Sequence, residues 1–452
     1  MQNITNKTIL AALAVSALVG CKPNLKAPSS DAGSVNVSKY VALGNSITSG
    51  YADGALYYEG QTFSYAVILN EQFKTVGGGE FSMPYLPSGS VGVGSSGNAP
   101  FIMGYKTDCK GVNALSPVPA SANGAGDVSV FAPLASATDY NCVGVPGAKV
   151  VTAIFGGYGN PGNGPGNYNP YFMRMLAPTE FAKSMLDKAK SQGHTFFTCF
   201  LGNNDVLGYA TSGGTSDPMS PMGPIPGITL GFTMSYDSII NAMTRGGQKG
   251  AIANIPDVTS LPYFTTVPSR GLVLSAAQAA GLSAAYAPLG ISFTAGVNGF
   301  VIKDATALGG MRKATANDYI LLSVPSDSIK CYGYGSTTAI PDKYVLTSTE
   351  VAAIRTRTGE YNAKIKAVAD AKGLAYVDAN AFMATAKSGI TYNGVAISAA
   401  FASGGAFSLD GVHLTPRGNA LLANEFIKAI NNTYGSSIKE VDVTKYRGVK
   451  FP

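Results

Sequence analysis

The sequence predicts an α/β fold in which helices cover both faces of a parallel β-sheet. Short apolar, β-rich runs alternate along the chain with segments whose apolar residues have helical spacing, a pattern typical of parallel sheets. Residues 195–201 are apolar almost throughout, as in a strand buried on both faces. Because 46% of the residues are apolar and only 13% are charged, the chain can bury a large core, which excludes general disorder.

Five segments are expected to form the strands. They are residues 37–43, which stop at Gly44, and residues 140–145, 195–201, 251–255 and 374–377. Each is a short run rich in apolar or β-branched residues, and each ends at residues that favour a turn or a helix start.

Four segments are expected to form helices: residues 62–73, 178–190, 350–372 and 416–430. The third is the clearest, because Val351, Ile354, Tyr361, Ile365 and Val368 are spaced for one buried face. The fourth begins at Thr415-Pro416, with threonine suited to the N-cap and proline to the first helical position.

Two long segments, at about 76–138 and 257–346, interrupt this alternation and are rich in Gly, Ser and Pro. We interpret them as insertions into one domain that spans residues 37–434. Residues 435–452 are then a C-terminal tail.

The first twenty residues have the pattern of an export signal. Lys7 precedes an apolar run over residues 9–19, which is too short to span a bilayer. The run ends Leu18-Val19-Gly20-Cys21, which resembles the lipobox of bacterial lipoproteins. The resemblance implies cleavage before Cys21, lipidation of that thiol and anchoring to a bacterial membrane, at its periplasmic face or the cell surface. Residues 21–36 are then a tether. A plain secretory peptide with an incidental cysteine is the alternative.

Four cysteines remain after Cys21: Cys109, Cys142, Cys199 and Cys331. An exported protein can form disulfides, and four cysteines allow three full pairings. Cys199 lies within an apolar run and is expected to be a buried thiol. The sequence does not choose between the pairings.

Composition excludes several functions. The chain has two histidines, His194 and His413, which excludes a His-rich metal centre and leaves few candidates for a general base. The net charge of +6 is spread out with no Lys/Arg run, so we expect no nucleic-acid partner.

Reactive groups in such sheets gather at the carboxyl ends of the strands. Ser46 follows the first strand, Gly147 follows the second and Asn204 follows the third. Each also has a plain structural interpretation: a turn serine, a tight turn and a capping amide.

His413 distinguishes between these interpretations. It lies in Asp410-Gly411-Val412-His413, directly before the last helix, where one short loop can aim the carboxylate at the imidazole. His194 directly precedes the third strand and lies about seven residues from that strand's carboxyl end, which at about 3.3 Å per residue places it roughly 20 Å from the carboxyl ends. We expect His194 to be a surface-turn residue and His413 to be the base.

The four segments 44–50, 141–148, 202–205 and 410–413, in this order, resemble the signature blocks of the SGNH hydrolases, also called GDSL esterases and lipases. The resemblance implies a three-layer α/β/α sandwich with a central parallel sheet of flavodoxin-like type. It also implies a serine esterase with Ser46, Asp410 and His413 as the catalytic triad. Ser46, Gly147 and Asn204 would form the oxyanion hole, and no metal or cofactor is implied. The family usually has Gly-Asp-Ser where this chain has Gly44-Asn45-Ser46, which puts local hydrogen bonding in doubt.

The expected substrate is a carboxylic ester, either an acylated carbohydrate or a lipid or short-chain ester. Tyr158, Tyr168 and Tyr171, in a Gly- and Asn-rich stretch after the second block, are candidate substrate contacts, with an ordered solvated loop as the alternative. A function of another class stays open: a catalytically idle lipoprotein that binds surface glycans. The sequence does not predict the oligomeric state.

Overall fold

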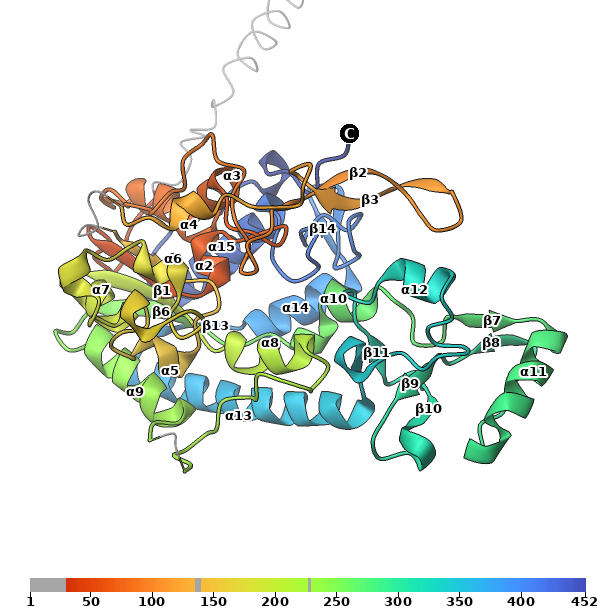
Figure 1. The fold of residues 1–452 in the computed structure, drawn as a ribbon. Coiled ribbons are helices and arrows are strands. Elements are labelled where there is room, and N and C mark those ends of the chain that lie inside the picture. Colours follow the sequence, from red (N-terminus) through yellow and green to blue (C-terminus); the bar gives the residue numbers. More distant parts are fainter. Residues whose placement is uncertain (1–29, 135–139, 227–228) are drawn as a thin grey trace, which may run out of the picture.

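A computed structural model describes residues 30–134, 140–226 and 229–452 (Figure 1). Its centre is a five-stranded sheet made of β1 (Tyr40–Gly44), β4 (Cys142–Gly144), β5 (Phe196–Phe200), β6 (Lys249–Ala253) and β13 (Ala375–Val377). These are the five predicted strands, each a few residues shorter or shifted at its ends. The spatial order is β13-β6-β5-β1-β4 and every neighbouring pair is parallel, which confirms the predicted α/β class.

The order of the sheet reverses next to β1. Numbered along the chain, the strands lie in the order 2-1-3-4-5, so the first and third strands are neighbours, as in doubly wound flavodoxin-like sheets. Gly44 of β1 is level with Phe200 of β5 and with Gly144 of β4. The carboxyl ends of these three strands therefore meet at one place, where such folds bind their ligands.

Helices cover both faces of the sheet (Figure 1). On one face, α15 (Pro416–Tyr434) packs on α4 (Tyr65–Lys74) and on β13. On the other, α9 (Phe232–Met243) contacts both α7 (Met185–Ser191) and α13 (Ser348–Lys372). The result is the three-layer arrangement that the resemblance implies.

The predicted start of the last helix is correct, whereas the predicted helix over residues 178–190 is wrong. The Thr415 hydroxyl accepts a hydrogen bond from the Gly418 N–H, and Pro416 is the first residue of α15, as predicted. The expected single helix over residues 178–190 is instead a 3-10 turn, Pro178–Glu180, followed by a separate α7. The reason is a capping box, in which the Ser184 hydroxyl accepts from the Asp187 N–H while the Asp187 carboxylate accepts from the Ser184 N–H.

Shorter elements connect these layers. The helices are α2 (Ser46–Ser49), α3 (Tyr58–Thr62), α5 (Val150–Ala153), α6 (Pro170–Met173), α8 (Asn204–Thr211), α10 (Pro262–Thr265) and α14 (Ala379–Ser388), and β14 (Ile390–Tyr392) pairs with β15 (Val395–Ile397).

The two segments interpreted as insertions form projections beside the sheet. The first contains a hairpin of β2 (Phe101–Thr107) and β3 (Asn113–Pro119), drawn in orange in Figure 1. The second, which we call the lobe (residues 257–346), contains α11 (Ala276–Tyr286) and α12 (Ser326–Lys330). Its strands are β7 (Leu272–Leu274), β8 (Gly296–Asn298), β9 (Val301–Lys303), β10 (Met311–Lys313), β11 (Tyr319–Ile320) and β12 (Val345–Leu346). The lobe has two hydrophobic clusters of its own, around Val301 and Ile302.

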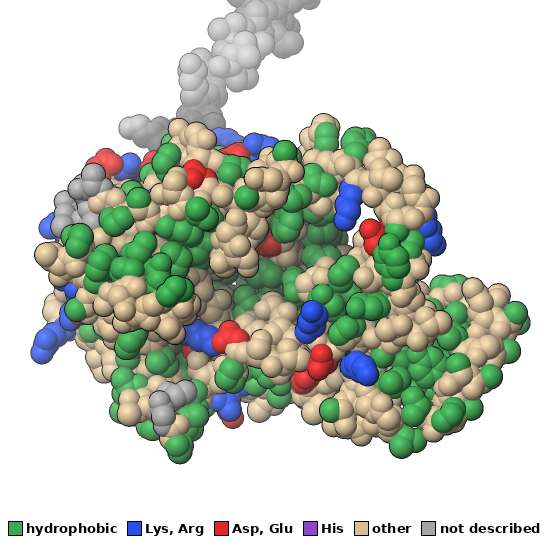
Figure 2. Space-filling view, in the orientation of Figure 1, with side chains coloured by type: hydrophobic (Ala, Val, Ile, Leu, Met, Phe, Trp, Pro, Cys, Tyr) green, Lys and Arg blue, Asp and Glu red, His purple; other side chains and the backbone are tan. Residues whose placement is uncertain are grey.

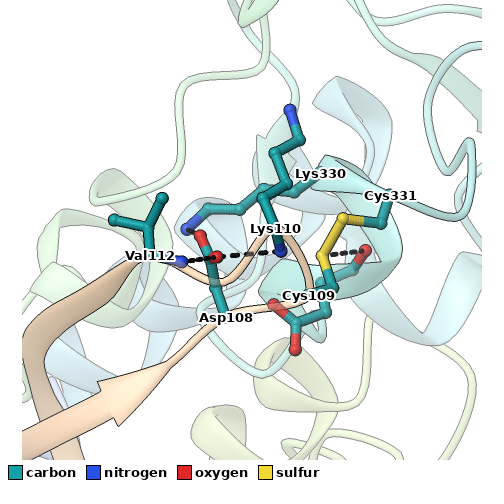
Figure 3. The surroundings of a disulfide bond; sticks show 7 residues. Asp108, Cys109, Lys110, Val112, Lys330 and Cys331 are labelled. Carbon is teal, nitrogen blue, oxygen red and sulfur yellow. Dashed lines mark hydrogen bonds and ion pairs between the residues drawn. A yellow bond between two sulfur atoms is a disulfide. The ribbon is translucent and has the colours of Figure 1, made fainter.

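A disulfide joins the two projections. Cys109, at the turn of the hairpin, is bonded to Cys331, which follows α12 (Figure 3). Next to it, the Lys330 ammonium lies 3.0 Å from the Asp108 carboxylate. Cys142 and Cys199 are buried free thiols, as expected for Cys199. The pairing that the sequence left open is therefore Cys109 with Cys331.

The N-terminal end of the described chain lies against the body. The Ser34 N–H donates to the carbonyl of Tyr434 at the end of α15, and the Asp31 N–H donates to the Ser437 hydroxyl. Within the part of the chain that the structure describes, no helix is both long and apolar enough to cross a membrane. Cys21 and the leader 1–20 lie outside the described residues.

Candidate active site

Ser46 is the first residue of α2, directly after β1. The turn is tight, since a Cβ at Gly44 would overlap the Thr48 hydroxyl, and glycine is therefore required there. Asn45 caps the helix, because its side-chain oxygen accepts from the Ile47 N–H at 3.0 Å. The residue that departs from the family pattern thus still makes an N-cap, although its Nδ2 has no hydrogen-bond partner among the described residues.

A chain of hydrogen bonds links Ser46, His413 and Asp410. The Ser46 hydroxyl lies 2.8 Å from Nε2 of His413, and Nδ1 of the same ring lies 2.8 Å from Oδ2 of Asp410. With the proton on Nδ1 donated to the carboxylate, Nε2 is left free to accept the serine proton. Residues that are 367 positions apart in the sequence are therefore placed together, as predicted from the strand ends and the Asp410–His413 spacing.

The Asp410 carboxylate accepts several hydrogen bonds. Its Oδ1 accepts from the backbone N–H groups of Val412 and His413 at 2.8 Å each and from the Ser408 hydroxyl at 3.1 Å. Its Oδ2 accepts from the Gly54 N–H at 2.8 Å as well as from the imidazole. Burial alone would raise the pKa of Asp410, but the His413 charge and these hydrogen bonds outweigh it and hold the pKa well below its ordinary value.

Two of the three predicted oxyanion-hole residues, Gly147 and Asn204, follow β4 and β5. Asn204 begins α8, and its Nδ2 donates one hydrogen bond to the Ala148 carbonyl at 3.0 Å, which leaves a second N–H. Asp205 accepts from the Val150 N–H at 3.0 Å, so two hydrogen bonds tie the two turns together. Gly147 lies in the first of these turns with φ +80°, a conformation that favours glycine.

One cavity adjoins Ser46. It is lined by Asn45, Ser46, Asn203, Asn204 and His413 and by thirteen apolar residues: Ile47, Phe200, Leu207, Pro256, Val258, Leu261, Ala379, Phe382, Met383, Phe407, Val412, Leu414 and Leu422. No Lys, Arg, Asp or Glu is among the lining residues. Gly147 lies in the neighbouring turn, outside this set. The space-filling view shows hydrophobic side chains in a hollow between the main body and the lobe (Figure 2).

Three residues that support the site were not predicted from the sequence. The Tyr51 ring packs on the His413 ring at 4.7 Å between centroids, and Gly54 and Ser408 donate to Asp410. None of them follows a strand end or pairs with a histidine by spacing. Their only signal is closeness in sequence to Ser46 or Asp410.

The three tyrosines considered as substrate contacts do not line this cavity. Tyr171 is buried instead, with its hydroxyl donating to the Val93 carbonyl and its ring packed edge-on against Tyr51. Tyr158 accepts a hydrogen bond from Asn169. Both rings therefore support the loop that carries them.

The expectation that His194 is a surface-turn residue is wrong. Its side chain is buried, and its ring packs edge-on against Phe197. Its Nε2 is hydrogen-bonded to the Met243 carbonyl at the end of α9. Burial lowers its pKa. The position argument still holds, because His194 precedes β5 and lies at the end of the strand opposite to Phe200, the residue level with Gly44.

Comparisons with known proteins assign the chain to a family. A family model described as GDSL-like Lipase/Acylhydrolase matches residues 40–426, most of the described chain. The protein therefore belongs to the GDSL-like lipase/acylhydrolase family, whose members are serine hydrolases that act on esters. The search of curated proteins found no match. Among the described residues, no three His, Cys, Asp or Glu side chains are grouped so that they could hold a metal ion.

Proposed function

We propose that the protein is a serine esterase in which Ser46 is the nucleophile, His413 the general base and Asp410 the residue that orients the imidazole. The observation that carries this proposal is the unbroken row of 2.8 Å hydrogen bonds from Ser46 through His413 to Asp410. This geometry is what acyl transfer by an activated serine needs.

The reaction follows from these positions. His413 takes the Ser46 proton as Oγ attacks the ester carbonyl, then gives it to the leaving alcohol. Asp410, held ionised by its donors, stabilises the imidazolium that forms between these steps. The backbone N–H groups of Ser46 and Gly147 and the free N–H of Asn204 would hold the oxyanion. A donor of this kind typically contributes about 10²–10³ in kcat. Water then cleaves the acyl-enzyme by the same route.

The direct test replaces the nucleophile. We expect Ser46→Ala to lower kcat on a short-chain chromogenic ester by about 10⁶, the loss typical of a serine nucleophile. Ser238→Ala, at an exposed serine of α9, is the matched control and should keep full activity. A fluorophosphonate should label wild type and not Ser46→Ala. If folded wild type neither hydrolyses the ester nor is labelled, the proposal is wrong and the glycan-binding alternative gains support.

The cavity favours an ester whose acyl group is apolar. Thirteen apolar side chains surround the space beside Ser46, so a hydrocarbon chain would gain free energy on entering it, whereas a sugar hydroxyl there would lose its hydrogen bonds to water. We therefore propose that the acyl chain occupies this cavity and the alcohol part lies outside it.

An acyl-chain series tests the assignment. We expect kcat/KM to rise from acetyl to longer linear acyl esters, and Val258→Phe, which fills part of the cavity, to reduce activity on the longer esters more than on the acetyl ester. Highest activity on acetylated oligosaccharides, with no gain along the series, would contradict it.

We also propose that the protein is exported and anchored to a bacterial membrane through lipidated Cys21. The support is the sequence Leu18-Val19-Gly20-Cys21 after an apolar run.

A further inference from the structure

Gly54 donates to Asp410, whereas its neighbour Asp53 has no role in the reaction as described so far. Both residues have positive φ, +54° for Asp53 and +79° for Gly54. Glycine adopts this conformation freely, but for aspartate it is uncommon and costs free energy. A residue held in such a conformation must be fixed by its surroundings.

Asp53 and Gly54 contact three consecutive residues of the loop that carries Asp410 and His413. The Asp53 N–H donates to the Ser408 hydroxyl at 2.9 Å, and Asp53 Oδ1 accepts from the Leu409 N–H at 2.9 Å. The Gly54 N–H donates to Asp410 Oδ2 at 2.8 Å. The Ser408 hydroxyl in turn donates to Asp410 Oδ1. One turn near the nucleophile therefore holds the loop that supplies the base.

Other contacts fix Asp53 itself. The Tyr57 hydroxyl donates to its Oδ2 at 2.6 Å, and the Phe101 N–H, at the base of the β2–β3 hairpin, donates to its carbonyl at 2.7 Å. Burial raises the pKa of Asp53, and the hydrogen bonds from Tyr57 and Leu409 act against this. A half-buried carboxyl on a backbone with positive φ costs free energy, and the contacts of Asp53 offset part of that cost.

We propose that Asp53 is a positioning residue of the reaction: it holds the Asp410–His413 loop in register with Ser46 and does not touch the substrate. Asp53 lies outside the set of residues that line the cavity at Ser46, which agrees with an indirect role. The inference rests on the proposed esterase function. A shift of about 1 Å in a catalytic group can cost about 10²-fold in rate, so a loosened loop should reduce kcat.

The test compares two replacements of the same residue. Asp53→Gly removes the carboxyl and also relieves the strain at φ +54°, so a purely structural view predicts no loss of activity. We expect it to lower kcat on a short-chain ester by about 10–100-fold, with KM changed by less than twofold because the cavity is intact. Asp53→Asn keeps an oxygen for the Leu409 N–H and tolerates positive φ, so it should restore kcat to within about threefold of wild type.

Tyr57→Phe is the matched control. It removes one contact that fixes Asp53 but leaves the Ser408 and Leu409 contacts in place, so we expect it to lower kcat clearly less than Asp53→Gly does. Rates are expressed per active site, counted by fluorophosphonate labelling, so that a poorly folded fraction of any variant does not enter kcat.

The outcomes separate this inference from the esterase proposal. An inactive, unlabelled wild type overturns the esterase proposal. An active wild type with an Asp53→Gly variant of equal kcat per labelled serine overturns the positioning role alone. Equal losses in Asp53→Gly and Asp53→Asn also overturn it, because the Leu409 contact would then not be what matters.

Discussion

Two buried residues, His194 and Asp205, show how burial changes what a side chain can do. His194 is a residue type that can act as a general base, but its ring packs against Phe197 and is bonded to the end of α9. The sequence correctly predicted that His194 lies at the end of the strand away from Ser46, but it did not predict that the side chain is buried. Its burial could not be predicted, because it depends on where the end of a helix some fifty residues later comes to lie. The position of Ser46 was predictable because it follows a strand end. The pairing of Asp410 with His413 was predictable because the two residues are three positions apart in one short loop.

Asp205 is the second of these residues. Burial raises the pKa of its carboxyl from 3.8 to about 6, and its Oδ1 has no hydrogen-bond partner among the described residues. The folded protein thus holds this proton more tightly than the unfolded chain does. The contribution of Asp205 to the free energy of unfolding is therefore greatest below about pH 4 and is lost as the pH rises to about 6.

We expect Asp205→Asn to remove this pH dependence. The amide keeps an oxygen for the Val150 N–H and never ionises, so the variant should be more stable than wild type at pH 7, by up to about 3 kcal/mol. Urea unfolding at pH 4.5 and at pH 7 measures the difference. Equal pH dependence in the two proteins would show that the Asp205 carboxyl does not titrate in this range.

At the scale of elements, the sheet was predictable and the projections were not. The five strands are apolar runs of the length that a buried parallel sheet requires, and Thr415-Pro416 marks the start of α15. The segment 178–190 was predicted as one helix from its apolar spacing alone, and the Ser184–Asp187 capping box was not recognised. The sequences of the hairpin and the lobe have no regular spacing of apolar residues. Their short strands are held by pairing with each other and by the disulfide, which the sequence pattern does not show.

The disulfide gives an element-scale prediction. Replacing both Cys109 and Cys331 with serine should free the hairpin from the lobe, and a bond of this kind typically contributes about 2–4 kcal/mol. Both projections also contact the residues around the site. The Phe101 N–H donates a hydrogen bond to the Asp53 carbonyl, and the Tyr263 N–H donates one to the Gly411 carbonyl. We expect faster amide hydrogen exchange in β2, β3 and α12, with the central sheet unchanged.

A matched control for the disulfide variant is available within the chain. Cys142→Ser and Cys199→Ser alter buried free thiols in β4 and β5 and should affect the sheet rather than the projections. If the double variant exchanges as slowly as wild type in β2, β3 and α12, the remaining contacts, such as the Lys330–Asp108 ion pair, are sufficient to hold them.

At the scale of the whole molecule, the proposed anchor determines where the enzyme works. Several acyl chains on one residue hold a protein stably on a membrane, whereas one chain is marginal. We expect the exported protein to partition into the detergent phase and Cys21→Ala to partition into the aqueous phase with unchanged activity per molecule. A Cys21→Ala protein that still enters the detergent phase would show that another part of the chain carries the membrane affinity.

The pairing of Cys109 with Cys331 also determines the order in which the molecule is completed. The bond spans 222 positions, so it cannot close until the hairpin and the lobe have both been synthesised, by which point β1, β4, β5 and β6 have already emerged. Cys142 and Cys199 emerge between the two partners, and their burial in β4 and β5 keeps them away from other thiols once the sheet has formed. The last strand and the Asp410–His413 loop are made after all four cysteines. If the chain enters an oxidising compartment with its N-terminal part first, the two projections can be joined before His413 arrives. A chain that stayed in a reducing cytosol would lack this bond.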